Sequence, residues 1–291
     1  MTKSFLKFAV PLSALTMLVL CPSPVAAKPA CVVSPAKIRL GETVRVACTS
    51  SAASARLGNK TIKLFRQADN SYLGLLPISV KAKPGAYDVE ILGDADHVSE
   101  SLALTIVPTR FPTQNVKLSP EIEALHSTED EMKLLTAFRD TISDDRFWKD
   151  PLQAPVTGCM TSPFGVVRLH NGKPTGEYHG GVDQRTPAGE PIRAIAAGMV
   201  KFARPFNVLG NAVGIDHGQG LESTYLHMSK LEVAEGTHVE KGDILGYAGS
   251  TGRSTGPHLH WVLYANQVNV NPAQWVKLAP CAPPPKSSKK P

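Results

Sequence analysis

The sequence predicts a mainly β protein in which two folded domains are joined by a helical linker. Its 291 residues are enough for two domains, and 42% of them are hydrophobic against 19% charged, which excludes disorder for most of the chain. The 23 glycines and 24 prolines favour short strands and turns over long helices, because both residue types interrupt regular elements. The net charge of +6 comes without clustered arginines and interleaved aromatic residues, so we expect no nucleic acid partner.

Residues 1–27 have the pattern of a secretory signal peptide. Lys3 and Lys7 precede an apolar run at residues 8–20, and small residues follow at 25–27. At ~1.5 Å rise per residue this run is too short to cross a ~30 Å hydrocarbon core. We therefore expect cleavage after Ala27 and export without stable membrane insertion. A periplasmic location is favoured over an extracellular or cell-wall one.

Export places the remaining cysteines in an oxidising compartment, where disulfides form. Four cysteines follow residue 27, and none belongs to a C-x-x-C pair of the kind found in structural zinc sites. Three pairings are possible. We favour Cys31 with Cys48 and Cys159 with Cys281, one disulfide in each half of the chain.

Residues 28–108 predict an immunoglobulin-like β-sandwich, because short runs of alternating polarity are separated by turn residues. These runs are residues 37–40, 43–47, 61–65, 73–76, 87–92 and 101–106. The region carries no pattern of catalytic side chains, so we expect it to act as a spacer or adaptor.

Residues 109–152 predict a linker that contains one amphipathic helix. Ser127, followed by Asp130 and Glu131, indicates the helix start. Apolar residues then recur every three or four positions, at Met132, Leu135, Phe138 and Ile142. At the end of the chain, the Pro- and Lys-rich residues 281–291 are expected to form a disordered tail.

Residues 153–280 predict a second domain, in which four histidines and one aspartate form short motifs. His179 and Asp183 lie in an H-G-G-V-D segment whose glycines disfavour a helix, and in an extended chain positions i and i+4 share one face. His258 and His260 lie at i and i+2 of a predicted strand, on the same face and about 6.6 Å apart. His227 lies in a Tyr-Leu-His segment. Imidazole and carboxylate ligands without cysteine are typical of a catalytic zinc site.

The order of these motifs, with H-x-H preceded by the glycine-rich segment 249–257, resembles the M23 family of zinc metallopeptidases of the lysostaphin and LytM type. The similarity runs from about residue 163 to residue 272. The resemblance implies an antiparallel β-sheet groove domain that binds Zn²⁺ through His179, Asp183 and His260. It implies that His227 and His258 are catalytic histidines that do not bind the metal. We assign His258 as general base and His227 as oxyanion stabiliser.

The resemblance also implies a function, namely a secreted zinc-dependent endopeptidase that hydrolyses peptide cross-links of bacterial peptidoglycan through a zinc-activated water. In Gram-negative relatives the bond is typically the one between D-alanine and diaminopimelate. An alternative is a non-catalytic peptidoglycan-binding activator of other cell-wall hydrolases, although the complete set of ligands argues against it. A third reading, an adhesive element, would rest on the N-terminal region.

Several other features of the second domain are expected to be structural. Residues 252–256 match G-x-S-x-G, but a strand follows where a nucleophile elbow needs a helix. We therefore expect residues 249–256 to form a flexible loop beside the groove. His217 and Asn211 are assigned to turns. The remaining histidines are expected to face solvent; they are His97, His126, His170 and His238.

Overall fold

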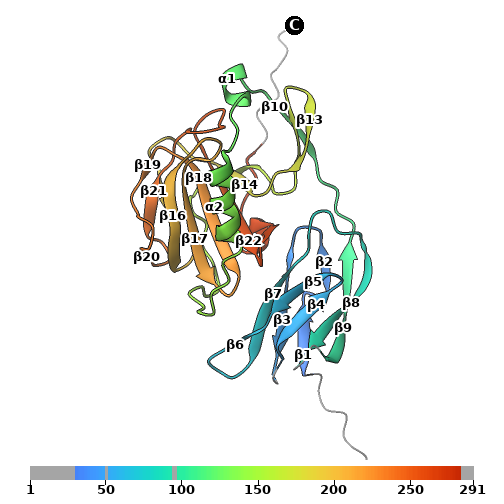
Figure 1. The fold of residues 1–291 in the computed structure, drawn as a ribbon. Helices are drawn as coiled ribbons and strands as arrows, with labels where there is room; N and C mark the ends of the chain where they lie inside the picture. The colour runs from blue at the N-terminus through green and yellow to red at the C-terminus, as the bar shows by residue number, and fades with distance from the viewer. Residues whose placement is uncertain (1–29, 50–51, 94–96, 283–291) are drawn as a thin grey trace, which may run out of the picture. The chain divides into compact units, whose positions relative to one another are not determined.

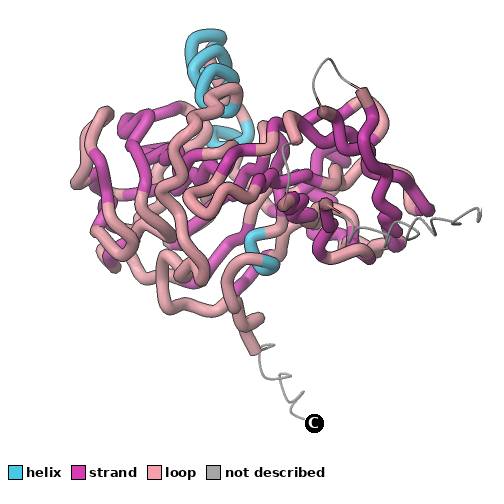
Figure 2. Tube along the Cα trace, turned by 90° about the horizontal axis from the view of Figure 1, so that it is seen from below, coloured by secondary structure: helices cyan, strands magenta, loops and turns pink. Residues whose placement is uncertain are grey.

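The computed structural model describes residues 30–49, 52–93 and 97–282, and its fold is mainly β, as the sequence predicts (Figure 1). Figure 2 shows that strands and loops account for nearly all of the described trace and that helix is confined to short segments. The predicted signal peptide and residues 283–291 of the predicted tail lie outside the described residues. No helix among the described residues is long and apolar enough to span a membrane.

Residues 31–107 form two β-sheets. One has the strand order β1-β3-β7-β6, with β1 (Cys31–Ser34), β3 (Thr43–Cys48), β7 (Tyr72–Pro77) and β6 (Phe65–Arg66). The other has the order β2-β9-β8-β4-β5, with β2 (Lys37–Arg39), β9 (Val98–Val107), β8 (Gly85–Leu92), β4 (Ser54–Leu57) and β5 (Lys60–Lys63). Strands β1 and β4 were not predicted from the sequence. The immunoglobulin-like assignment and the domain boundaries stay predictions.

Both predicted disulfides are present. Cys31 is bonded to Cys48, its register partner across β1 and β3. Cys159 is bonded to Cys281, which fixes the end of the second domain beside β11.

The linker contains α1 (Pro120–Glu123) and α2 (Glu129–Arg139). Thr128, not Ser127, caps α2: its hydroxyl accepts from the backbone N–H of Glu131, whose side chain accepts from the backbone N–H of Thr128. The predicted apolar stripe is only partly right. Phe138 is buried and Leu135 packs beside it, whereas Met132 and Ile142 are exposed, because α2 covers the sheet only near its end and stops before Ile142.

An antiparallel sheet forms the centre of the second domain, with the order β11-β14-β22-β18-β17-β16-β20 and β23 beside β22. Its strands are β11 (Met160–Ser162), β14 (Val182–Arg185), β16 (Gly198–Phe206), β17 (Gly210–Gly218), β18 (Leu221–Met228), β20 (His238–Val239), β22 (His258–Ala265) and β23 (Val268–Val270). Phe138 of α2 packs edge-on against Phe202 of β16, with ring centroids 5.1 Å apart.

Two three-stranded sheets flank the central one. The first has the order β10-β12-β13, with β10 (Thr113–Val116) parallel to β12 (Val167–His170) and β13 (Lys173–Tyr178) antiparallel to it. The second has the order β15-β21-β19, with β15 (Pro191–Arg193), β21 (Ile244–Tyr247) and β19 (Lys230–Leu231). A 3₁₀ turn, η2 (Pro272–Gln274), follows β23. The linker thus supplies β10, one strand of the sheet next to the site.

His217 shows where the turn assignment is wrong. It is fully buried in β17, where its ring bonds to the carbonyl oxygen of Ala197 at 2.8 Å and the hydroxyl of Ser223 at 2.7 Å. Burial lowers its pKa to about 4, so the ring is neutral and serves to join β17 to its neighbours. Asn211 also lies in β17, not in a turn.

Candidate metal centre and active site

The register of three strands brings the predicted site residues together. Asp183 of β14 lies directly opposite His260 of β22, and His260 is also the partner of Leu226, the residue before His227 on β18. Alternation along β22 places His258 on the same face as His260, while Leu259 between them is fully buried. The register of the sheet therefore brings Asp183, His227 and the two histidines of β22 close together.

His179 reaches the same place from the segment between β13 and β14. The segment is not one extended strand, because β13 ends at Tyr178 and β14 begins at Val182. Gly181 is required there, since an added Cβ would lie 2.1 Å from the carbonyl oxygen of Trp261 on β22. The predicted convergence is nevertheless present: His179 Nε2 lies 3.1 Å from Asp183 Oδ1.

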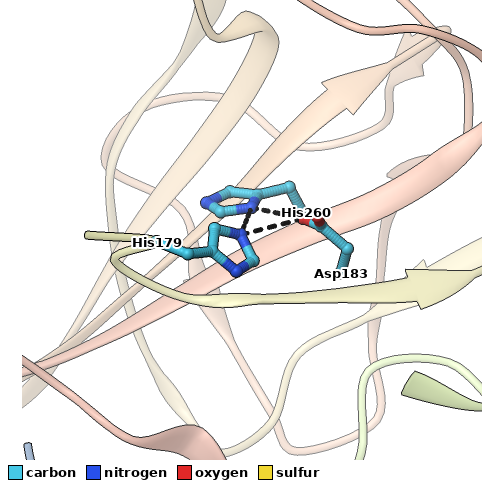
Figure 3. A group of neighbouring side chains, drawn as sticks. All are labelled: His179, Asp183 and His260. Atoms are coloured by element: carbon cyan, nitrogen blue, oxygen red, sulfur yellow. Dashed lines mark hydrogen bonds and ion pairs between the residues drawn. The ribbon is translucent and has the colours of Figure 1, made fainter. Parts of the chain in front are cut away.

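Three possible metal ligands face one another (Figure 3). His260 Nδ1 lies 2.6 Å from Asp183 Oδ1 and 2.9 Å from His179 Nε2, and the three ligand atoms all lie within 4.8 Å of one another. The His179 Nδ1–H donates to the carbonyl oxygen of Pro163 at 2.9 Å, so the Nε2 lone pair is available. Two imidazoles and one carboxylate fit a zinc ion and leave a coordination position for substrate or water.

Contacts around Asp183 favour the protonation states in which the three possible ligands can bind a metal ion. Asp183 Oδ2 accepts from Arg168 Nη2 at 2.6 Å, which leaves Oδ1 directed at the two imidazoles. Burial opposes ionisation of Asp183, but its contacts with His179 and His260 outweigh the effect of burial and hold its pKa well below the usual value. Burial lowers the pKa of His260 to about 4. The carboxylate is thus ionised and His260 neutral at neutral pH, as metal binding requires.

His227 and His258 lie beside this set with matching tautomers. Each Nδ1–H donates to a backbone carbonyl oxygen 2.8 Å away, that of Thr251 for His227 and that of Gly256 for His258. Each Nε2 is therefore the nitrogen with a lone pair. The two ring centroids are 5.1 Å apart, and His258 Nε2 lies 3.8 Å from Asp183 Oδ1.

His227 is held in an unusual backbone conformation, with φ of 61°. Left-handed backbone is uncommon outside glycine and concentrates at functional sites. Burial, together with the neighbouring His260 and His258, lowers the pKa of His227 to about 3, so the ring is neutral at neutral pH.

Residues 177–272 match the model of peptidase family M23, and this stretch contains all five site residues. This match identifies residues 177–272 as an M23 peptidase domain. It is 45% identical over 113 residues to the DD-carboxypeptidase/endopeptidase Mpg of Neisseria meningitidis, and 38% identical over 112 residues to the peptidoglycan DD-endopeptidase ShyA of Vibrio cholerae. These alignments cover 39% and 38% of this chain but 26% of each relative, so the chain spans about a quarter of their length.

A solved structure resembles more of this chain than the family match covers. It is a protein from Pseudomonas aeruginosa described as a candidate M23 peptidase, and it is 29% identical. The superposition has a TM-score of 0.60 and covers 78% of this chain and 88% of that chain. The fold likeness therefore extends beyond residues 177–272.

A groove in the M23 domain surrounds the site residues. Its main cavity of about 340 Å³ contains Asp183, His227, His258 and His260 on its lining. The predicted loop beside the groove is confirmed, because residues 253–257 form part of the wall. Residues of the linker, among them Gln114 on β10, line the cavity as well.

Three basic residues of the groove were not predicted as site residues. Arg168 and His170 of β12 and Arg253 line both the main cavity and an adjoining one of about 210 Å³. His170 was expected to face solvent, and this is wrong: it is half-buried in the groove wall. Alternation in the R-L-H segment could have shown that Arg168 and His170 share a face, but not which face the groove occupies.

Proposed function

We propose that this M23 chain is an exported zinc endopeptidase that hydrolyses peptide cross-links of bacterial peptidoglycan in the periplasm. The observation that carries the proposal is the convergence of His179, Asp183 and His260 within 4.8 Å, beside two further histidines that each keep an Nε2 lone pair. Mpg and ShyA, the relatives named above, support peptidoglycan as the substrate. The bond expected from the family resemblance joins D-alanine to diaminopimelate.

The three ligands are suited to hold zinc because their hydrogen bonds fix both charge and orientation. The His179 Nδ1–H donates to the carbonyl oxygen of Pro163, and Asp183 Oδ2 accepts from Arg168 Nη2. A bound zinc ion supplies Lewis acidity, which polarises a scissile carbonyl and lowers the pKa of water to ~7.

His258 is assigned the role of general base. Its Nε2 lies at the edge of the ligand set, 3.8 Å from Asp183 Oδ1, and its Nδ1–H is held by the carbonyl oxygen of Gly256. From this position His258 Nε2 takes a proton from the attacking water and returns it to the leaving amine.

His227 is assigned the stabilisation of the oxyanion, with one added requirement. Its Nδ1–H is committed to Thr251, and burial keeps the ring neutral in the free groove. A hydrogen bond from His227 Nε2 to the developing oxyanion therefore requires a proton on this nitrogen, and its source is the second proton of the attacking water, the one that His258 does not take.

Mass spectrometry of soluble products from purified cross-linked peptidoglycan tests this function. Incubation with the chain lacking residues 1–27 should release fragments with new amino and carboxyl ends. The fragments should vanish with a zinc chelator and return when zinc is restored. Asp183→Asn should release none, whereas Asp88→Asn, an exposed carboxylate on β8, should match the wild type. Bound zinc without products from the wild type would contradict the proposal and favour the non-catalytic activator.

A further inference from the structure

Three basic side chains gather in the groove next to the metal ligands. Arg168, His170 and Arg253 each line both cavities, and they therefore lie where the two cavities meet. Burial and the positive charges of Arg253 and Arg168 lower the pKa of His170, which shows that the three groups are close. Glu123 and Glu177 partly offset this effect.

The two guanidinium groups are only partly satisfied by the protein, and only Arg168 contacts a carboxylate. Arg168 uses Nη2 for Asp183 Oδ2, and Arg253 uses Nη2 for the carbonyl oxygen of Leu125. Arg253 forms no ion pair with any residue in the described part of the chain. The Nε atoms of both arginines are buried and make no hydrogen bond within the described residues.

Zinc would increase this excess of positive charge, because Asp183 neutralises only part of a divalent ion. Desolvated cations are costly unless an anion pairs with them. A guanidinium offers several N–H donors in a plane that matches a carboxylate. A carboxylate on the substrate would supply negative charge at this place.

We infer that Arg168 and Arg253 form a subsite for a free carboxylate of the substrate, on the residue whose nitrogen leaves. This inference rests on the proposed function. In a D-alanyl–diaminopimelate cross-link, the carbon that bears the leaving nitrogen also bears a free carboxylate. The arginines line the same cavity as His258 and His260.

Two cross-linked peptide dimers test the subsite with the zinc-loaded protein. They differ only in the diaminopimelate carboxylate beside the scissile bond, which is free in one and amidated in the other. The wild type should cleave the free acid with kcat/KM about ten- to a hundredfold higher, the effect expected of a charge-assisted hydrogen bond. KM for the free acid should rise with salt, and KM for the amide should not.

Arg253 is the informative position, because Arg168 also holds a metal ligand. Arg253→Gln should bring the ratio of kcat/KM between the two dimers close to one, and Arg253→Lys should keep part of the preference. Arg204→Gln, at an exposed arginine of β16, should keep the wild-type ratio.

Several results would overturn the inference and leave the proposed function standing. The first is equal cleavage of both dimers by the wild type. The second is a ratio of kcat/KM in Arg253→Gln that equals the wild-type ratio. If Arg253→Gln loses activity equally on both dimers, Arg253 only anchors Leu125. If Arg253→Gln does not fold, the salt dependence of the wild-type KM decides, and a flat response rejects the subsite. No cleavage of either dimer by the wild type would overturn the proposed function and the subsite with it.

Discussion

Replacing Glu222 by glutamine should stabilise the protein by an amount that grows with pH. Glu222 lies on β18, the strand that carries His227, opposite Asp216 of β17. Its side chain is fully buried and neither carboxyl oxygen makes a hydrogen bond among the described residues. Burial, with Asp216 and Asp140 nearby, raises its pKa from 4.5 to about 9. The folded protein therefore keeps a proton that the unfolded chain releases.

The sign and size of the effect follow from this difference in proton binding. Because the pKa of Glu222 is raised in the folded state, its contribution to the free energy of unfolding is fully present below pH 4.5. This contribution is lost as pH rises from 4.5 towards about 9. Each pH unit in this window lowers the free energy of unfolding by about 1.4 kcal/mol, which amounts to about 3 kcal/mol between about pH 5 and about pH 7. Glutamine does not titrate, so the free energy of unfolding of Glu222→Gln does not show this decrease with pH.

Urea denaturation of the metal-free protein at a series of pH values measures the difference. The free energy of unfolding of Glu222→Gln minus that of the wild type should rise by about 3 kcal/mol over the stated interval. Glu235→Gln, at an exposed glutamate, should give a difference that does not depend on pH. A constant difference for Glu222→Gln, or one that grows towards low pH, would mean that Glu222 does not keep its proton on folding.

Three further predictions concern the site and the elements that support it. His258→Ala should lower kcat by about 10²- to 10⁴-fold while elemental analysis still finds zinc, and loss of zinc would contradict its assignment as a metal-free base. Gly181→Ala should lower both the melting temperature and the zinc content, because the added Cβ would lie 2.1 Å from Trp261 O. Zinc binding at the wild-type level would contradict the idea that the backbone at position 181 must lie this close to β22. Phe138→Ala should destabilise the fold by about 3–5 kcal/mol in urea denaturation, since the ring is buried against Phe202, and a loss below ~1 kcal/mol would show that α2 is not needed for stability.

The sequence was sufficient to predict that His179, Asp183 and His260 come together. Short-range geometry and an ordered motif carried that prediction, and the roles of these residues and of the two other histidines stay predictions. Alternation along one strand sets His258 and His260 on one face, and Leu259 on the other. The sequence could not show that Asp183 pairs with His260, because register between distant strands depends on the whole sheet. The motif resemblance supplied that link.

The features that were missed depend on contacts between distant segments. His217 has turn-like neighbours in sequence, but the sheet buries it between Ala197 and Ser223. The role of Arg168 requires the position of β12 beside the groove, which its parallel pairing with β10 helps to set. The N-cap of α2 was predicted one residue too early because Ser127 and Thr128 are both good capping residues. Only Thr128 lies three residues before Glu131, the spacing at which the two residues bond to each other's backbone N–H.

Titration of the metal-free protein with zinc, in which bound zinc and cleavage of a cross-linked peptidoglycan dimer are measured together, shows whether the three-ligand site drives hydrolysis. Cleavage should rise in proportion to bound zinc, and both should saturate at about one ion per chain, as expected for one three-ligand site. Cleavage that is complete without zinc, or zinc that saturates the site without cleavage, would contradict zinc-dependent hydrolysis at this site.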